Sequence, residues 1–171
     1  MGSATTQALS ATAVTLDAQT VTLDTARELF FAARVVSEST QLSGALADPS
    51  ASVDARQALA SAVFGGSTPA TVAVLRSAVS QRWSDAGDLI DGIEELAIRA
   101  AAIAEPGTDL EGELFGVSRV VSANPELELA LGSRLGDASA KATLIETLLN
   151  GTASVATTLV VSSLVRQSRG R

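Results

Sequence analysis

The acidic side chains near the middle of the sequence are its most obvious candidates for chemistry, namely Asp85, Asp88, Asp91, Glu94 and Glu95. On a helix, spacings of three would place Asp88, Asp91 and Glu94 along one face, where carboxylates could bind magnesium. Magnesium sites usually serve phosphate-bearing substrates, and only Arg82 and Arg99 lie nearby to bind phosphate. Because such charge runs are usually exposed, we interpret this group as a solvated helix face.

The sequence lacks the residues that the other common kinds of catalytic site need. The chain has no cysteine and no histidine, which excludes disulfides, thiolate chemistry, the usual zinc sites and histidine-based acid–base catalysis. No serine stands in a setting that would activate it as a nucleophile. The stretch Gly65 to Thr68 resembles a phosphate loop but has neither the lysine nor the preceding strand, so a helix cap explains it better. We predict no enzyme activity, no cofactor and no metal ion.

Charge and hydropathy narrow the choice of partner. The formal net charge is -7 and the pI is near 4.5, which argues against nucleic acid or anionic lipid as the main partner. The longest apolar run, Val155 to Val165, falls short of the ~18 residues of a membrane span and is interrupted by hydroxyl residues. We therefore expect a protein partner, no nucleic acid and no membrane insertion.

The composition favours helices. Hydrophobic residues make up 46% of the 171 residues and aromatic residues only 3%, which suits small, closely packed helices better than a sheet. The pattern predicts an all-α protein with helices near residues 4–18, 24–39, 41–47, 53–64, 69–82, 88–104, 109–123, 125–132, 138–149 and 153–167. Trp83, the single tryptophan, is interpreted as a core side chain rather than an interface residue.

Residues typical of helix ends support these boundaries. Thr25 to Glu28 and Thr108 to Glu111 each have the spacing of a capping box at a helix start. Thr68-Pro69 and Asn124-Pro125 each place a capping side chain before a proline at the first helical position. Helix ends are expected where the chain can turn or cannot continue the helix, at Gly65-Gly66, Glu105-Pro106-Gly107 and Asn150-Gly151.

The sequence repeats itself at a constant offset of about 85 residues. Glu28-Leu29-Phe30 and Arg34 to Ser37 align with Glu113-Leu114-Phe115 and Arg119 to Ser122. Roughly a quarter of ~59 ungapped columns are identical. We predict two tandem copies of a five-to-six-helix unit, over residues 1–86 and 87–171.

A helix between the copies is expected to serve both of them. Its apolar residues recur at spacings of three and four, at Leu89, Ile93, Leu96, Ala100 and Ile103. This spacing predicts an amphipathic linking helix over residues 88–104 that the two units share.

The order of these signals resembles the helical N-terminal domain of the delta subunit of F-type ATP synthase, called OSCP in mitochondria. The second copy contains, in the family's order, Asn124-Pro125-Glu126-Leu127, Leu131-Gly132-Ser133, Lys141 to Ile145, Leu148 to Gly151 and Arg169-Gly170-Arg171. The first copy follows the same plan, and the doubled arrangement is similar to an extended variant of delta with a duplicated helical domain.

The resemblance implies a mechanical function. Delta joins the catalytic head to the b stalk and resists rotor torque, and an N-terminal helix of an α subunit docks between the first and fifth helices of its domain. By position those helices are 4–16 with 71–79, or 88–104 with 155–165. We favour the second pair because of its stronger apolar stripe, and the partner-binding residues would be Leu89, Ile93, Leu96, Ala97, Ala100, Val155, Leu159 and Ser163. The alternative is that every one of these residues belongs to the core.

The family's C-terminal α/β domain, which contacts the b stalk, does not follow within this sequence, so the chain is expected to be a fragment. The resemblance also implies a peripheral location at the cytoplasmic face of the cell membrane, within the ATP synthase complex. Two alternatives stay open. One is a stand-alone helical adaptor with an unrelated partner, and the other is a metal hydrolase that uses the acidic group.

Overall fold

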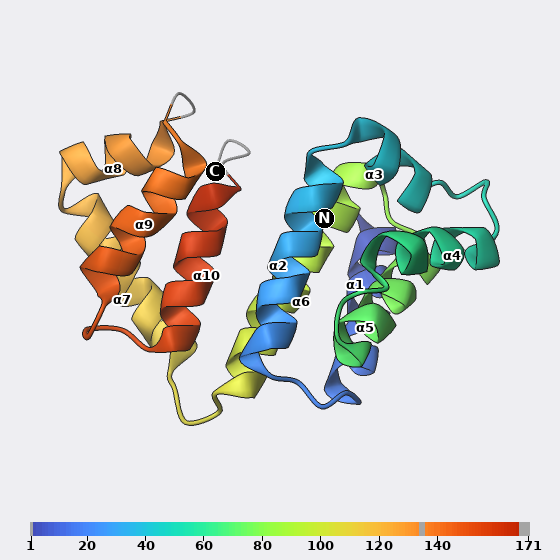
Figure 1. Ribbon diagram of the computed structural model, residues 1–171, viewed down its shortest axis with the longest axis horizontal. Helices are drawn as coiled ribbons and strands as arrows, with labels where there is room; N and C mark the ends of the chain where they lie inside the picture. The colour runs from blue at the N-terminus through green and yellow to red at the C-terminus, as the bar shows by residue number, and fades with distance from the viewer. Residues whose placement is uncertain (1, 134–135, 168–171) are drawn as a thin grey trace. The chain divides into compact units, whose positions relative to one another are not determined.

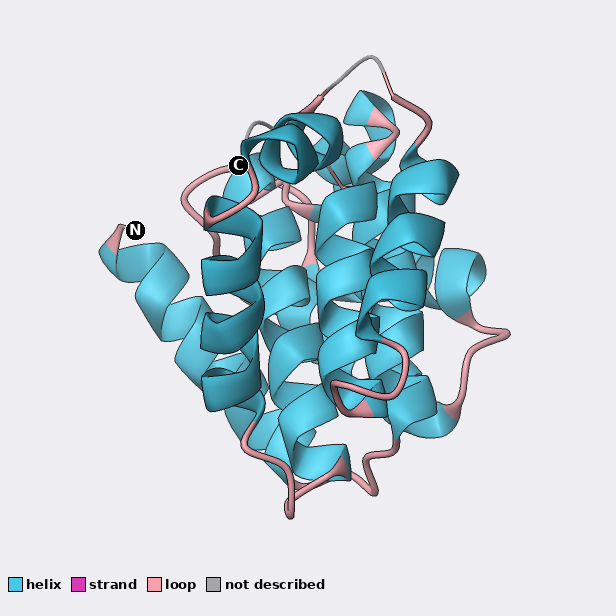
Figure 2. Ribbon diagram, turned by 90° about the vertical axis from the view of Figure 1, so that its left-hand side faces the viewer, coloured by secondary structure: helices cyan, strands magenta, loops and turns pink. Residues whose placement is uncertain are grey.

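The computed structural model describes residues 2–133 and 136–167, and within them it contains ten α-helices and no strand, which confirms the all-α prediction (Figures 1 and 2). The helices, in chain order, are α1 Ser3–Asp17, α2 Leu23–Ser37, α3 Thr40–Leu46, α4 Val53–Phe64, α5 Pro69–Ser80, α6 Ala86–Ala104, α7 Leu110–Ser122, α8 Pro125–Gly132, α9 Ala138–Leu149 and α10 Val155–Arg166. The last signal of the proposed resemblance, Arg169 to Arg171, lies outside the described residues.

The order of the helices follows the sequence repeat. Both bounds of α9 come after those of α4 by the repeat offset, and α8 begins one offset after α3. Helices α7 to α10 thus correspond in order to α2 to α5, while α6 stands one offset after α1. This is the order that two tandem copies sharing a linking helix would produce.

Packing divides the chain into two compact units, residues 1–103 and 104–171. The predicted division between residues 86 and 87 separates the two copies in the sequence, whereas packing groups almost all of α6 with the helices before it. One of the contacts that join α6 to the first unit lies at its start, where Asp88 Oδ2 accepts a 2.7 Å hydrogen bond from Thr5 Oγ1 of α1.

Helix α6 is a central element of the first unit. Nine of its residues are buried, and they form one broad face that is wider than a single stripe and covers about half of the helix. Trp83 packs on α6 where Gly92 leaves room, since a Cβ at Gly92 would overlap the indole ring. The indole Nε1 donates a 2.8 Å hydrogen bond to the carbonyl of Ala78. Trp83 is 4% exposed, so its interpretation as a core residue is confirmed.

The two predicted capping boxes are wrong. Helix α2 begins three residues earlier, and the box that forms there pairs Thr22 with Thr25, whose Oγ1 accepts from the Thr22 N–H at 3.2 Å. Helix α7 begins after Asp109, whose carboxylate accepts from the Gly112 N–H at 3.0 Å. In both places several capping side chains stand side by side in the sequence, and local spacing does not determine which of them meets the free N–H groups.

The predicted proline and glycine signals agree with the structure, but the two capping side chains predicted before the prolines are wrong. Pro69 and Pro125 occupy the first positions of α5 and α8, whereas the side chains of Thr68 and Asn124 accept no capping hydrogen bond. Gly65 caps the end of α4, and Gly151 follows α9 with a φ of 80°, a left-handed conformation that glycine adopts without strain. The local chemistry of the chain therefore fixed where most helices begin and end.

Candidate functional site

The acidic group on and before α6 makes hydrogen bonds within the protein. Asp85 Oδ1 accepts from the Asp88 N–H at 2.8 Å, as an N-terminal cap would, and Asp88 is bonded to Thr5. Glu94 is 3% exposed, so the interpretation of this group as a solvated face is wrong at Glu94. Within residues 2–133 and 136–167, no cluster of side chains could hold a metal ion.

The five partner-binding residues predicted on α6 share one side of that helix and are buried. Leu89, Leu96, Ala97 and Ala100 are 0% exposed and Ile93 is 1% exposed. As α6 stands in the structure, these side chains can support a docking surface from beneath but cannot themselves contact a partner.

The three predicted residues on α10 are spaced by four, so they also share one side of their helix. Val155 is 58% exposed, Leu159 is half-buried and Ser163 is 7% exposed. Val155 and Leu159 are therefore accessible apolar positions. The residues on α10 belong to the second unit and those on α6 to the first.

The corresponding pair in the first unit, α1 and α5, is packed side by side. The hydroxyl groups of Thr15 on α1 and Ser77 on α5 lie 2.9 Å apart and share a hydrogen bond. One turn before Thr15, Ala11 is exposed on the same side of α1. The first and fifth helices of the first copy thus contact each other directly, and Ala11 is accessible on the same side of α1 as the contact residue Thr15.

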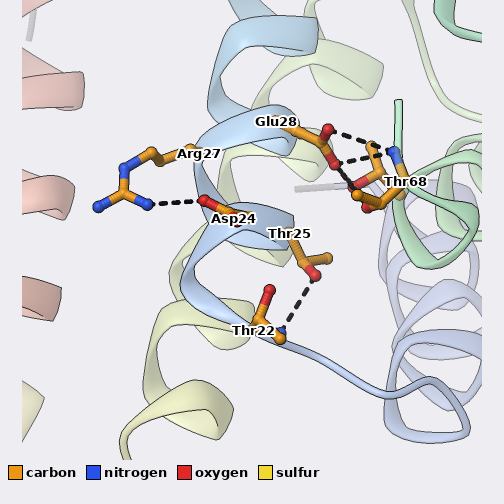
Figure 3. A network of polar contacts seen from close by, with 7 residues as sticks. Thr22, Asp24, Thr25, Arg27, Glu28 and Thr68 are labelled. Atoms are coloured by element: carbon orange, nitrogen blue, oxygen red, sulfur yellow. Dashed lines mark hydrogen bonds and ion pairs between the residues drawn. The ribbon is translucent and has the colours of Figure 1, made fainter. Parts of the chain in front are cut away.

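A carboxylate on α2 holds the start of α5 in place (Figure 3). Glu28 Oε1 accepts hydrogen bonds from the hydroxyl groups of Thr68 and Thr71, each at 2.6 Å, and the Thr68 N–H donates to the same carboxylate at 3.2 Å. Partial burial alone would raise the pKa of Glu28, but these hydrogen bonds outweigh it and lower the pKa below its usual value. Nearby, Asp24 and Arg27 form an exposed ion pair at 2.9 Å.

The second unit repeats this arrangement with one contact. Glu113 Oε1 on α7 accepts a 2.7 Å hydrogen bond from the backbone N–H of Ser154, the residue that precedes α10. Glu28 and Glu113 are equivalent in the sequence repeat, and each binds the start of the fifth helix of its copy. The repeat had indicated that these glutamates correspond, but not what they bind.

An apolar groove in the second unit was not predicted. It lies between α7, α8 and α9 and has a volume of about 920 Å³. Seven of its twelve lining residues are valine or leucine, with Val120, Leu144 and Leu148 the most exposed of them, and the polar lining residues are Asn124, Glu126 and Thr152. In the sequence these residues had marked only the repeat and the family resemblance, because nothing in the sequence shows that they remain accessible after folding.

None of the helices in residues 2–133 and 136–167 combines the length and the apolar character needed to cross a membrane.

Comparison with known proteins gives a consistent result, although no family model matches the chain. All of this chain aligns with 66% of the protein named ATP synthase subunit delta from Leifsonia xyli, at 42% identity over 174 residues. The proteins of the same name from Streptomyces avermitilis and Nocardia farcinica are each 38% identical over 152 residues, covering 85% and 86% of this chain. The chain spans between about half and two thirds of the length of these relatives.

Proposed function

The chain belongs to the family of ATP synthase delta subunits, and on that premise we propose that it acts as a peripheral-stalk subunit of a proton-translocating F-type ATP synthase. In this role it joins the catalytic head to the b stalk by binding N-terminal segments of α subunits, and it performs no chemistry of its own. The observation that carries the proposal is the 42% identity along the whole chain to a protein named ATP synthase subunit delta.

The proposed contact with α is a helix laid in a groove between two helices. Of the eight residues predicted on α6 and α10, which belong to different units, Val155 and Leu159 on α10 remain our first choice as the positions that touch the partner. The surface of α1 and α5 around Thr15 and Ser77 is the second choice. It is supported by the direct packing of these two helices.

The same proposal places the protein at the cytoplasmic face of the cell membrane, held there through its complex rather than by insertion. Contact with the b subunit would be made by the part of the longer relatives that this chain does not span. An adaptor with an unrelated partner is the alternative, and it differs from the stator proposal in having no affinity for the α subunit.

Titration calorimetry tests the proposal. The titrant is a peptide covering the N-terminal segment of the α subunit of Leifsonia xyli, whose delta subunit is 42% identical to this chain. We expect saturable binding with a negative change in heat capacity, because apolar surface is buried. If the folded chain, verified by circular dichroism, binds no peptide at any concentration reached, the stator proposal fails and the adaptor alternative is preferred.

Three variants locate the contact. Val155→Asp places a charge on the exposed side of α10, and Ala11→Asp does so on α1 beside α5. Whichever surface binds the peptide, its variant should weaken binding at least about tenfold, equivalent to 1.4 kcal/mol. Leu129→Asp is the matched control, because Leu129 is 75% exposed on α8, a helix that belongs to neither pair. Unchanged binding in both test variants would rule out both assigned surfaces.

A further inference from the structure

The groove between α7, α8 and α9 is an open apolar surface inside the second unit. Val120 is 58% exposed, Leu144 38% and Leu148 48%, while Ile145 at the floor is 1% exposed. Large apolar side chains that stay accessible together, rather than singly, mark binding surfaces in soluble proteins. The groove is formed by the second unit alone, so its shape does not depend on where the first unit lies.

The equivalent place in the first unit is closed. Leu149, half-buried in the groove, corresponds in the repeat to Phe64, a larger side chain that is 5% exposed. Val121 is half-buried, whereas its counterpart Val36 is 0% exposed. Two copies of one helical plan therefore differ here. The first fills its core with an aromatic ring, and the second leaves a groove.

The charged side chain that lines the groove is a carboxylate, and carboxylates outnumber basic side chains in the described part of the second unit. Glu126, exposed in the first turn of α8, lines the groove, and its counterpart in the first copy is the neutral Gln41. In residues 104–133 and 136–167 there are eight carboxylate side chains, all exposed or half-buried. The basic residues described there are Arg119, which stacks on the Phe115 ring, Lys141, which is 6% exposed, and Arg166.

We propose that this groove binds an amphipathic helix of another protein, with an apolar stripe in the groove and lysine or arginine residues along its edges. A helix suits an apolar groove lined by neighbouring helices, since it can present residues at spacings of three and four to the groove. Its basic edges would meet Glu126 and Glu128, which are both exposed in the first turn of α8.

Charge also argues against a second copy of this chain as the occupant. The chain has a formal net charge of -7, and its own amphipathic helix α6 contains Asp88, Asp91, Glu94 and Glu95. A second copy would bring like charges together on an already acidic surface, which is unfavourable. This inference concerns a surface separate from the α6, α10, α1 and α5 faces, so it stands or falls independently of the proposed function.

The test uses two designed helical peptides of about 15 residues, long enough to form a helix on binding. Both have one leucine stripe, and the remaining positions are lysine in one peptide and glutamate in the other. Titrated into the 15N-labelled chain, the lysine peptide should bind saturably and shift the amide signals of Val120, Leu144 and Leu148. Equal binding of the glutamate peptide, or shifts that avoid these residues, would overturn the proposal.

Matched variants make the test specific to the groove. Leu148→Asp should weaken binding of the lysine peptide at least about tenfold, whereas Val63→Asp, at the equivalent and similarly exposed position of α4, should leave it unchanged. Glu126→Gln should reduce both the affinity and its dependence on salt. If Leu148→Asp unfolds the second unit, Val120→Asp replaces it. Equal losses in the α4 and groove variants would show non-specific binding and reject the site.

Discussion

Helices α2 and α7 have related sequences but different surroundings. Each contains Glu-Leu-Phe and then, after three intervening residues, Arg-Val-Val-Ser. Seven residues of α2 are buried, and among them Phe30 is 1% exposed. In α7 the buried residue is Leu110, the others are half-buried or exposed, and Phe115, the counterpart of Phe30, is 65% exposed. The same pattern thus forms a core helix in one unit and a surface helix in the other.

The difference shows that a repeated sequence repeats local structure more faithfully than packing. In both copies the equivalent arginine lies over a phenylalanine ring of its own helix, with Arg34 at 5.4 Å from Phe31 and Arg119 at 5.9 Å from Phe115, although these two rings are not equivalent in the repeat. Both glutamates also bind the start of the fifth helix. These contacts join neighbours within one copy, whereas the burial of α2 depends on the larger number of helices in its unit.

Truncation of the two phenylalanines should give the largest contrast. Phe30→Ala should destabilise the first unit by about 3–5 kcal/mol, because it leaves a cavity in the core. Phe115→Ala should cost at most about 1 kcal/mol, mainly through the lost contact with Arg119. Trp83, the single tryptophan, reports on the first unit in denaturant titrations followed by fluorescence. Hydrogen exchange of the α7 amides reports on the second. Equal losses would mean that α7 is covered in solution.

The glycines of α6 and α7 provide a second contrast. Gly92→Ala should destabilise the first unit by about 1–3 kcal/mol, because the added methyl group would overlap the Trp83 ring. Gly116→Ala on α7 has nothing within 4 Å of the new methyl group and should be neutral or stabilise by up to about 1 kcal/mol. A blue or red shift of Trp83 emission in Gly92→Ala would accompany the repacking, and an unchanged stability would contradict the tight contact.

The two glutamates should differ by the number of bonds they accept. Glu28→Gln should cost about 1–2 kcal/mol, because the two hydroxyl groups and the N–H that donate to the carboxylate lose a charged acceptor. Glu113→Gln should cost about 0.5–1 kcal/mol, since one N–H donates to it. Hydrogen exchange at Thr68 and Ser154 measures the two effects separately. A larger loss at Ser154 would reverse the comparison.

The effect of pH on the first unit should be the smallest of these differences. Because the pKa of Glu28 is lower in the folded protein than its ordinary value of 4.5, the carboxylate stabilises the fold above pH 4.5. That contribution is lost as the pH falls through the folded pKa. The stability difference between wild type and Glu28→Gln, measured by Trp83 fluorescence, should therefore shrink below pH 4.5. A difference that grows on acidification would contradict the sign of the shift.

The sequence located the helices well but the candidate surfaces poorly. Periodicity and the residues Pro69, Pro125 and Gly151 predict helix positions because they act within one or two turns of backbone. The capping box proposed over Thr25 to Glu28 is wrong, because the Glu28 carboxylate accepts hydrogen bonds from Thr68 and Thr71, which are distant in sequence. The stripe on α6 was read correctly as apolar, yet the same periodicity describes a docking face and a buried core helix.

What the sequence by itself determined is the helical class, the order of the helices and the family, since each rests on residue types at short spacings or on similarity along the whole chain. Tertiary structure alone decided that Leu89 and Ile93 are buried, that Phe30 and Phe115 have opposite exposures, and that Leu148 borders an open groove. Helix formation is governed by hydrogen bonds between backbone groups four residues apart, whereas the burial of a side chain depends on which distant segments pack against each face of its helix.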